Sequence, residues 1–344
     1  MDPSATAPPS DILVTTIHCE TAAQFMTALS PRGPAYSSAL PRGWIFRGHS
    51  NDVFKLVPTA LRNESKELLE LVLYSIANNE EQQSAEQRVL VNFLEVADSI
   101  GLHIPEDTQR LRRSFECRSK PSEVWPPDEV LSLMALAQHH GVPTRLLDWS
   151  RHPLKAALFA AFDASEAEDK SGLLSVWALS IEKLEMLGEE PKPFVVITAP
   201  SATNSNLRAQ EGIFTLAKHI KPDKSAVDRR PFDEILRDTF RSYGVKSPGP
   251  WFHRVTLPRT EAEQLCFDLA LEGITRATLF PDFYGVVKAM KDAARWYSAD
   301  DRPGSKRAKE HLKSFSISYE TTVNLIYVPL ETTTPPKGGK PPGH

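Results

Sequence analysis

Apolar residues from Asp128 to His140 recur in two stripes at the three- and four-residue spacing of a packed helix. The turn Gly141-Val142-Pro143 ends this helix, because glycine provides a C-cap and proline prevents continuation. The chain is then predicted to run extended from Thr144 to Asp148. Ser150 is predicted to cap a second helix, which is apolar on all sides from Leu154 to Phe162 and is therefore expected to be buried.

Elsewhere, short apolar or alternating runs predict strands, and capping signals predict helices. The predicted strands are Ile12 to Cys19, the segment that carries Arg47, Leu173 to Leu179, Pro193 to Thr198, Gly212 to Ala217, Phe252 to Leu257 and Thr322 to Val328. Predicted helices open at the capping boxes Thr21/Gln24 and Thr260/Glu263, which lead to Leu29 and Leu271, and at Pro281. The irregular order favours an α+β fold with a mixed or antiparallel sheet over a doubly wound parallel one.

One region differs from the rest in composition. Residues 62–120 are rich in Glu, Gln, Leu and Arg, with no glycine before Gly101 in their helical part, and predict a helical insertion or flanking layer. Residues 1–11 and 331–344 are rich in Pro, Ala, Ser, Thr, Gly and Lys, and are expected to be disordered tails. Residues 12–330 are interpreted as a single domain.

The overall charge sets limits on partners. The 40 basic residues nearly balance the 44 acidic ones, which argues against a dedicated nucleic-acid coat but leaves room for a local basic groove. The three cysteines lie far apart, so neither a disulfide framework nor a CxxC metal site is indicated. No signal segment is recognised, and the longest apolar run is too short to span a bilayer. A soluble cytoplasmic protein without a membrane partner is expected.

Several standard sites are missing from the sequence. It contains no GxxxxGK[ST], GxGxxG, HExxH or GxSxG motif. His139 and His140 could join Asp148 in a metal site, but adjacent residues of a helix point about 100° apart, and no metal is expected. One of these rings is predicted to hydrogen-bond to backbone or to Asp148 at the helix C-terminus, in an architectural role.

The charged residues around the turn allow two interpretations each. Arg47 either pairs with an internal carboxylate such as Asp148, or clamps an anionic ligand while Gly48 lets the backbone approach it closely. Arg145 either forms a local ion pair with Asp148 or contacts the ligand. Trp149 is either a core residue or a stacking platform.

A third polar segment precedes the Gly212 strand. If it is extended, Arg208 and Gln210 face the same side, and Glu211 faces away unless a bulge or turn intervenes. Four residues are expected to converge on one concave pocket, namely Arg47, Thr144, Arg145 and Gln210.

Two segments carry a family resemblance. Trp44-Ile45-Phe46-Arg47-Gly48-His49 and the run QHHGVPTRLLDWSRHPLKAALFAAF, which begins at Gln138, resemble the FRG domain, named after its Phe-Arg-Gly motif. Weaker matches follow at Arg208 to Thr215 and Leu279 to Gly285. The family more often has glutamine at His49, tyrosine at His140 and leucine at Phe283. The resemblance spans roughly residues 40 to 290.

The order of these parts also resembles that of arginine-type ADP-ribosyltransferases. That resemblance implies an ADP-ribosyltransferase-like sheet in which Arg47 grips the phosphates of NAD, Thr144 braces the site, and a carboxylate near Gln210 and Glu211 holds the nicotinamide ribose. Gln210 lies on the expected face but lacks charge, and Glu211 fits only in an altered register. The implied ligand-binding residues are Arg47, Gly48, His49, Arg145, Asp148, Trp149 and Arg208.

Three functions follow from these features. The first is an NAD-binding, ADP-ribosyltransferase-like enzyme with a protein or nucleic-acid acceptor, and the family's frequent bacterial setting would suit a phage-defence or toxin effector. The second is a non-catalytic module that recognises a nucleotide or nucleic acid through its arginines. The third is an interaction scaffold that uses the helical layer.

Overall fold

The computed structural model describes residues 14–30, 33, 43–63, 68–70, 76–115, 123–185, 193–198, 205–220, 223–242 and 250–297. Residues 1–290 form one compact unit, and residues 291–344 form a second. The predicted tails and the predicted strand Thr322 to Val328 lie outside the described residues. Within the described part, no helix combines the length and apolar content needed to cross a membrane.

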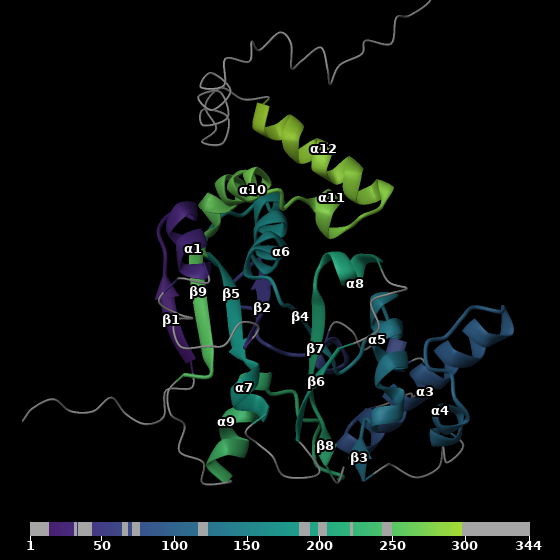
Figure 1. Ribbon diagram of the computed structural model, residues 1–344. Coiled ribbons are helices and arrows are strands. Elements are labelled where there is room, and N and C mark those ends of the chain that lie inside the picture. The colour runs from purple at the N-terminus through teal and green to yellow at the C-terminus, as the bar shows by residue number, and fades with distance from the viewer. Residues whose placement is uncertain are drawn as a thin grey trace, which may run out of the picture. The chain divides into compact units, whose positions relative to one another are not determined.

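The first unit is built on a mixed seven-stranded sheet (Figure 1). The strands, in spatial order, are β1 (Val14–His18), β9 (Phe252–Pro258), β5 (Leu173–Ser180), β2 (Trp44–His49), β4 (Leu147–Ser150), β7 (Gly212–Ala217) and β6 (Phe194–Ile197). Only the β1–β9 pair of this sheet is parallel. The predicted α+β class with a mixed sheet is therefore confirmed. A separate two-stranded pair, β3 (Val124–Trp125) with β8 (His219–Ile220), was not predicted, because two residues are too few to show alternation.

The backbone pairing between strands is least extensive in the middle of the sheet, between β2 and β4. β2 pairs with β5 along its whole length, from Trp44 to His49, but it pairs with β4 only where Phe46 faces Ser150. On the other side, β4 pairs with β7 at every residue from Leu147 to Ser150. The β2–β4 boundary therefore joins the two halves of the sheet through one backbone pair, and the Arg47 side chain adds a contact to Asp148 beside it.

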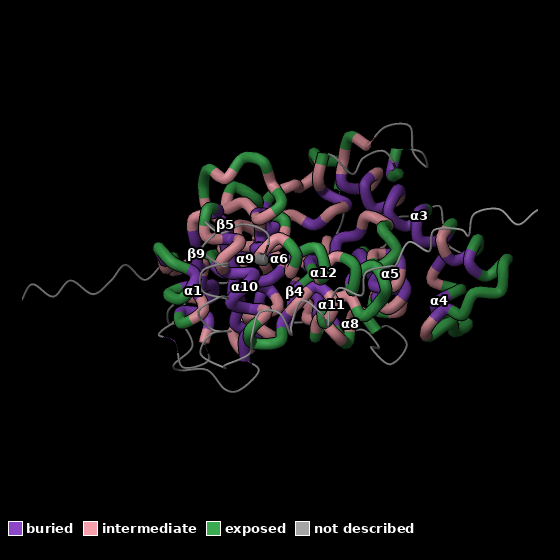
Figure 2. Tube along the Cα trace, turned by 90° about the horizontal axis from the view of Figure 1, so that it is seen from above, coloured by how far each residue is buried: buried purple, intermediate pink, exposed green. Residues whose placement is uncertain are grey.

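Three helices cover one face of the sheet. They are α1 (Ala22–Leu29), α6 (Pro153–Glu166) and α10 (Ala262–Leu271), and the trace around them is mostly buried (Figure 2). The predicted helix after Thr21 is confirmed, with the Thr21 side chain accepting the Gln24 N–H. The predicted cap at Thr260 is wrong, because a 3-10 turn, η4 (Arg259–Glu261), precedes α10 and no side chain caps it.

The start of α6 also differs from the prediction. Its N-cap is His152, whose ring nitrogen Nδ1 accepts the Leu154 N–H, and Pro153 occupies the first turn. Ser150 instead ends β4 and accepts the His152 N–H at 3.0 Å. The prediction missed this because histidine is an uncommon cap and serine a common one.

The opposite face is covered by α7 (Ile181–Glu185) and α9 (Phe232–Ser242). Phe232, Leu236 and Phe240 of α9 join a buried apolar cluster with Ile45 of β2 and Trp149 of β4. Since side chains of a strand alternate between faces, Arg47 and His49 lie on the same side of β2 as Ile45. Gly48 lies on the other side, against α6.

A helical layer packs on the far half of the sheet. It contains α3 (Asn79–Ser99), α4 (Gln109–Ser114) and α5 (Leu131–His139), preceded by η3 (Asp128–Val130). Its apolar core includes Leu90 and Leu133 and continues into Phe214 and Leu216 of β7. The remaining described helices are η1 (Thr59–Leu61), α8 (Ser205–Ala209), α11 (Arg276–Leu279) and α12 (Phe283–Tyr297).

Candidate functional site

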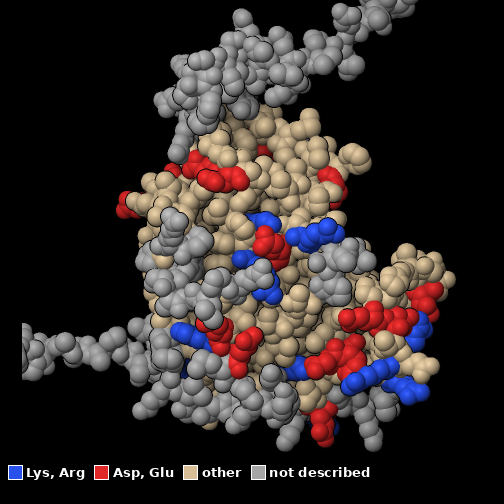
Figure 3. Space-filling model, in the orientation of Figure 1, with Lys and Arg blue, Asp and Glu red and all other residues tan. Residues whose placement is uncertain are grey.

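A cleft of about 840 Å³ opens where the two halves of the sheet separate. It is lined by the ends of β2 and β4, the 50–63 segment, one side of α6, Gln210 and Arg229. Its basic lining residues are Arg47, Lys55, Arg62 and Arg229, and its acidic ones are Asp148 and Asp163. On the molecular face drawn in Figure 3, basic and acidic side chains lie next to one another at the centre and at the lower right, whereas acidic side chains stand alone toward the top. The lining of this cleft, hereafter the Arg47 cleft, thus has more basic than acidic residues.

Arg47 is held along one edge of its guanidinium group. Nε donates to His49 Nε2 at 3.1 Å, and Nη1 donates to the backbone oxygen of Asp148 at 2.7 Å. The Asp148 carboxylate lies 3.6 Å from Nη1. Burial lowers the pKa of Arg47, and the charge of Asp148 opposes that effect. Among the described residues the Arg47 Nη2 atom has no hydrogen-bond acceptor, so the N–H groups of Nη2 are available to a ligand.

His49 fixes the orientation of Arg47. Arginine nitrogen can only donate, so His49 Nε2 accepts, and Nδ1 must carry the proton that it donates to the Phe54 carbonyl at 3.1 Å. Burial, reinforced by the charge of Arg47, lowers the pKa of His49 to about 3. The ring is therefore neutral near pH 7 and acts as a hydrogen-bond bridge.

A chain of hydrogen bonds joins Arg47 to the end of α5. Gln138 Nε2 donates to Asp148 Oδ1 at 2.5 Å, and the Thr144 hydroxyl donates to Gln138 Oε1. Thr144 Oγ1 also accepts the Leu146 N–H at 3.1 Å. Thr144 is buried and does not line the Arg47 cleft, so its connection to Arg47 runs through Gln138 and Asp148. Gln138 was not predicted as a site residue, although it extends the stripes of the predicted helix.

Arg145 is directed away from this cleft. Its Nε donates to Glu86 Oε2 at 2.6 Å, and both side chains are buried. Glu86 also accepts from Trp125 Nε1 and Gln82 Nε2, each at 2.8 Å. The predicted ion pair of Arg145 with Asp148 is therefore wrong. The spacing of Gln82 and Glu86, one helical turn apart, was the available signal, but the sequence does not show that this side of α3 is buried.

The third polar segment is not extended. Residues 205–209 form α8, and Glu211 follows in the left-handed region at φ 49°, so the alternation assumed for Arg208 and Gln210 is wrong. Gln210 lines the Arg47 cleft and donates through Nε2 to the Leu279 carbonyl at 3.3 Å. Glu211 is exposed and accepts from Lys155 Nζ at 2.9 Å. Neither Arg208 nor Glu211 lines the cleft.

Two further predicted ligand contacts have packing roles. The Trp149 side chain is buried, and its indole N–H donates to Thr215 Oγ1 at 2.8 Å, as in the core interpretation. The close backbone approach at Gly48 comes from α6: a Cβ at this position would lie 2.1 Å from the Ala156 carbonyl oxygen and 2.7 Å from the Ala160 nitrogen. Gly48 is therefore required by helix packing.

The two adjacent histidines end α5. Their rings contact each other edge-on at 5.1 Å, and His140 stacks on Phe93 at 6.5 Å. The predicted hydrogen bond to backbone or Asp148 is wrong, because neither ring bonds to a described residue. Within the described ranges, no group of three or more His, Cys, Asp or Glu side chains could hold a metal ion.

We expect the neutral state of His49 to make the fold sensitive to acid. In the folded protein the pKa of His49 is about 3, below its ordinary value of about 6.5. Between pH 6.5 and 3 the unfolded chain therefore binds a proton at His49, whereas the folded protein does not. The stability contributed by neutral His49 is present above about pH 6.5 and decreases by about 1.4 kcal/mol per pH unit below it. Urea unfolding at several pH values should show a shallower slope for His49→Gln, while the exposed control His103→Gln keeps the wild-type slope. Equal slopes for wild type and His49→Gln would contradict this role.

Residues 42–170 match the family model of the FRG domain. The matched segment includes β2 with Arg47, the helical layer, the Gln138–Asp148 connection and α6, but ends before Gln210. No curated protein and no solved structure matches the chain. The likeness to ADP-ribosyltransferases inferred from the order of motifs receives no support from these comparisons.

Proposed function

We propose that this FRG-domain chain binds the phosphate groups of a nucleotide such as NAD in the Arg47 cleft. The observation that carries the proposal is the Arg47 guanidinium, which is oriented by His49 and Asp148 and keeps Nη2 free of acceptors among the described residues. A planar guanidinium suits phosphate oxygens and, once oriented, loses little further entropy on binding. The volume of the cleft, about 840 Å³, suits a nucleotide-sized ligand.

Two more arginines strengthen the positive potential of the cleft. Arg62 Nε donates to the Val57 carbonyl at 2.8 Å, and Arg229 Nη1 donates to the Leu61 carbonyl at 2.9 Å. Within the described residues, neither has a carboxylate within 4.0 Å. The carbonyls position the two side chains without neutralising them. A di-anionic ligand would supply the missing countercharge.

Transfer of ADP-ribose from NAD to a protein or nucleic-acid acceptor is the second candidate function. Cleavage of the C–N bond to nicotinamide develops an oxocarbenium cation, which a nearby carboxylate stabilises. Asp148 lines the Arg47 cleft and has its carboxylate 3.6 Å from Arg47 Nη1, whereas Glu211 pairs with Lys155 outside the cleft. If the chain is an enzyme, we therefore assign the carboxylate role to Asp148.

We expect Arg47→Ala to weaken NAD binding at least tenfold, since loss of a charge-assisted contact to phosphate costs about 1.5–3 kcal/mol. Arg47→Lys should recover part of the affinity, because it keeps the charge but lacks the fork. Calorimetric titration of the full chain with NAD measures both effects. Arg151→Ala, which changes an arginine outside the lining, serves as the matched control. A wild-type chain that binds neither NAD nor ADP-ribose would refute the proposal.

Nicotinamide release separates a binding module from an enzyme. In the enzyme case, Asp148→Asn should abolish release by purified protein supplied with cell extract as the acceptor source, and Glu211→Gln should leave it unchanged. In the binding-module case, wild type binds NAD and releases no nicotinamide. Release that depends on Glu211 would contradict the assignment of Asp148.

A further inference from the structure

Two pockets share a wall with the Arg47 cleft. One has a volume of about 740 Å³ and shares Lys55 and Arg229 with the cleft. The other has a volume of about 530 Å³, shares Asp148, Phe159 and Gln210 with the cleft, and is hereafter the His139 pocket. A nucleotide whose phosphates bind Arg47 must place its base either in the cleft itself or in one of these two neighbours.

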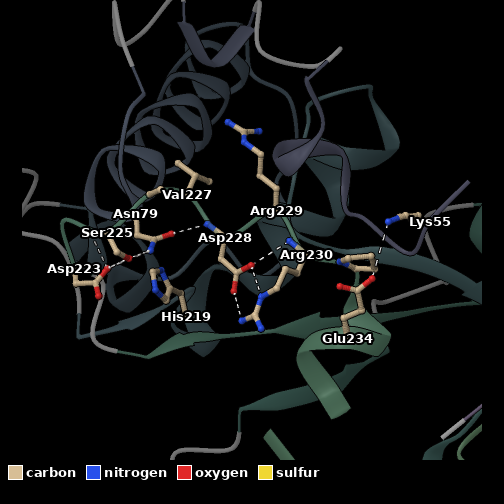
Figure 4. Close-up of a pocket in the computed structure, with 12 residues that line it drawn as sticks. Lys55, Asn79, His219, Asp223, Ser225, Val227, Asp228, Arg229, Arg230 and Glu234 are labelled. Carbon is tan, nitrogen blue, oxygen red and sulfur yellow. Dashed lines mark hydrogen bonds and ion pairs between the residues drawn. The ribbon is translucent and has the colours of Figure 1, made fainter. Parts of the chain in front are cut away.

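The 740 Å³ pocket is a poor place for a base. Figure 4 shows a row of polar side chains in it that bond to one another, from Asp223 through Asn79 and Asp228 to Arg230. Asn79 donates to Asp223 at 3.2 Å and accepts the Asp228 N–H at 3.1 Å. The Asp228 carboxylate accepts from Arg230 at 3.0 and 2.7 Å. No phenylalanine, tyrosine or tryptophan is among the described residues that line this pocket, so a base would find none of these rings to stack on.

The His139 pocket has the opposite character. Three phenylalanines line it, namely Phe159 of α6, Phe214 of β7 and Phe280 after α11. Phe214 is buried, whereas Phe159 and Phe280 are half-buried and meet edge to face at 5.8 Å. The described lining contains no lysine or arginine, and its one carboxylate, on Asp148, already pairs with Arg47. An aromatic lining without basic side chains suits a heteroaromatic ring and not a phosphate.

His139 offers a polar edge in the same pocket. The residue is exposed, and its ring contacts His140 edge-on at 5.1 Å but makes no hydrogen bond to a described residue. Burial, and then the charge of His140, lowers the pKa of His139, while the charge of Asp148 opposes them. The ring is therefore mainly neutral near pH 7, with one nitrogen that donates and one that accepts. The polar edge of a heteroaromatic base presents the same two kinds of group.

We propose that the His139 pocket binds the heteroaromatic base of the nucleotide whose phosphates bind Arg47. The base stacks on Phe159 and Phe280, and its polar edge bonds to His139. Phe159 connects the two parts of the ligand site, because it lines both the cleft and the pocket. The inference rests on the proposed function and adds to it the position of the base. Adenine and nicotinamide, the two bases of NAD, share the chemistry that this pocket recognises.

Calorimetric titration of the full chain with NAD, ADP-ribose and nicotinamide mononucleotide tests this position. Phe280→Leu removes an aromatic face without changing the lining of the Arg47 cleft, and should weaken NAD binding about fivefold or more. His139→Ala, at an exposed residue, should also weaken it. Phe162→Leu is the matched control, because Phe162 contacts Phe280 at 6.3 Å but does not line the pocket. Thermal melts of each variant confirm that it is folded.

The three ligands identify the base. Weaker binding of ADP-ribose to Phe280→Leu, with nicotinamide mononucleotide unaffected, identifies adenine, and the reverse result identifies nicotinamide. Equal weakening of both ligands would mean a general distortion and would overturn the inference.

Two further results would overturn the position of the base but not the proposed function. In the first, NAD binds to Phe280→Leu or to His139→Ala as tightly as to wild type, while Arg47→Ala still weakens binding. In the second, the loss appears in Phe54→Leu instead, which changes an exposed ring of the Arg47 cleft. A wild-type chain that binds neither NAD nor ADP-ribose refutes the proposed function and this inference together.

Discussion

Replacing Glu86 with alanine is expected to lower the free energy of unfolding by about 3–5 kcal/mol, because it leaves the buried charge of Arg145 without its carboxylate. The same change removes the acceptor of the Trp125 indole N–H and one acceptor of Gln82. These bonds connect α3 with β3 and with Arg145, which lies just before β4, so the packing of α3 against its neighbours should weaken. Urea unfolding near pH 7, followed by tryptophan fluorescence and by circular dichroism, measures the loss.

The matched experiment replaces both partners. The double variant Glu86→Leu with Arg145→Met should be more stable than the sum of the single effects predicts, since no unpaired charge remains in it. Arg110→Ala, which removes an exposed partner of Glu129 on the same layer, should change stability little. Near-wild-type stability of Glu86→Ala would mean that water reaches Arg145 and that the pair is not buried in solution.

Gly48→Ala is expected to cost about 3 kcal/mol or more, because the new methyl group would lie 2.1 Å from the Ala156 oxygen and 2.7 Å from the Ala160 nitrogen. Both are backbone atoms of α6, so no side-chain rotation relieves the clash. The helix must shift away from β2, and that shift would also move Arg47, the preceding residue. Denaturant unfolding and NAD titration of the variant should both show a loss.

Gly172→Ala is the control for this prediction. Gly172 has φ of 79°, and a Cβ there would have no neighbour within 4 Å. Its substitution should therefore cost only the conformational strain of a left-handed residue, about 1–2 kcal/mol. Equal losses for the two glycines would show that packing of α6 against Gly48 is not the cause.

The candidate site was only partly predictable. For Arg47 the sequence left two interpretations open, a pair with a carboxylate such as Asp148 or a clamp for an anionic ligand, and the structure shows the pair. Arg145 was assigned the same carboxylate, and only the position of α3 reveals Glu86 as its partner. Lys55, Arg62, Arg229 and His219 carry no motif, and they reach their pockets through loops whose course sequence periodicity does not describe.

The sequence by itself determined the strands of the large sheet, the helices on one of its faces and the mixed α+β class, which follow from the two- and 3.6-residue periods of apolar residues, but it did not predict α9 on the other face. Local rules failed at residues 205–211, where a helix and a left-handed Glu211 replace the expected extended segment. Only the tertiary structure decided which of the motif residues line the Arg47 cleft and which point elsewhere. Arg47 and Asp148 meet at the single β2–β4 contact, while Arg145 leaves the same turn toward Glu86 and His219. Long-range pairing and burial control where each of these side chains points. A charged side chain adopts the position in which a partner compensates for the loss of water around it, and the whole fold decides where that partner lies.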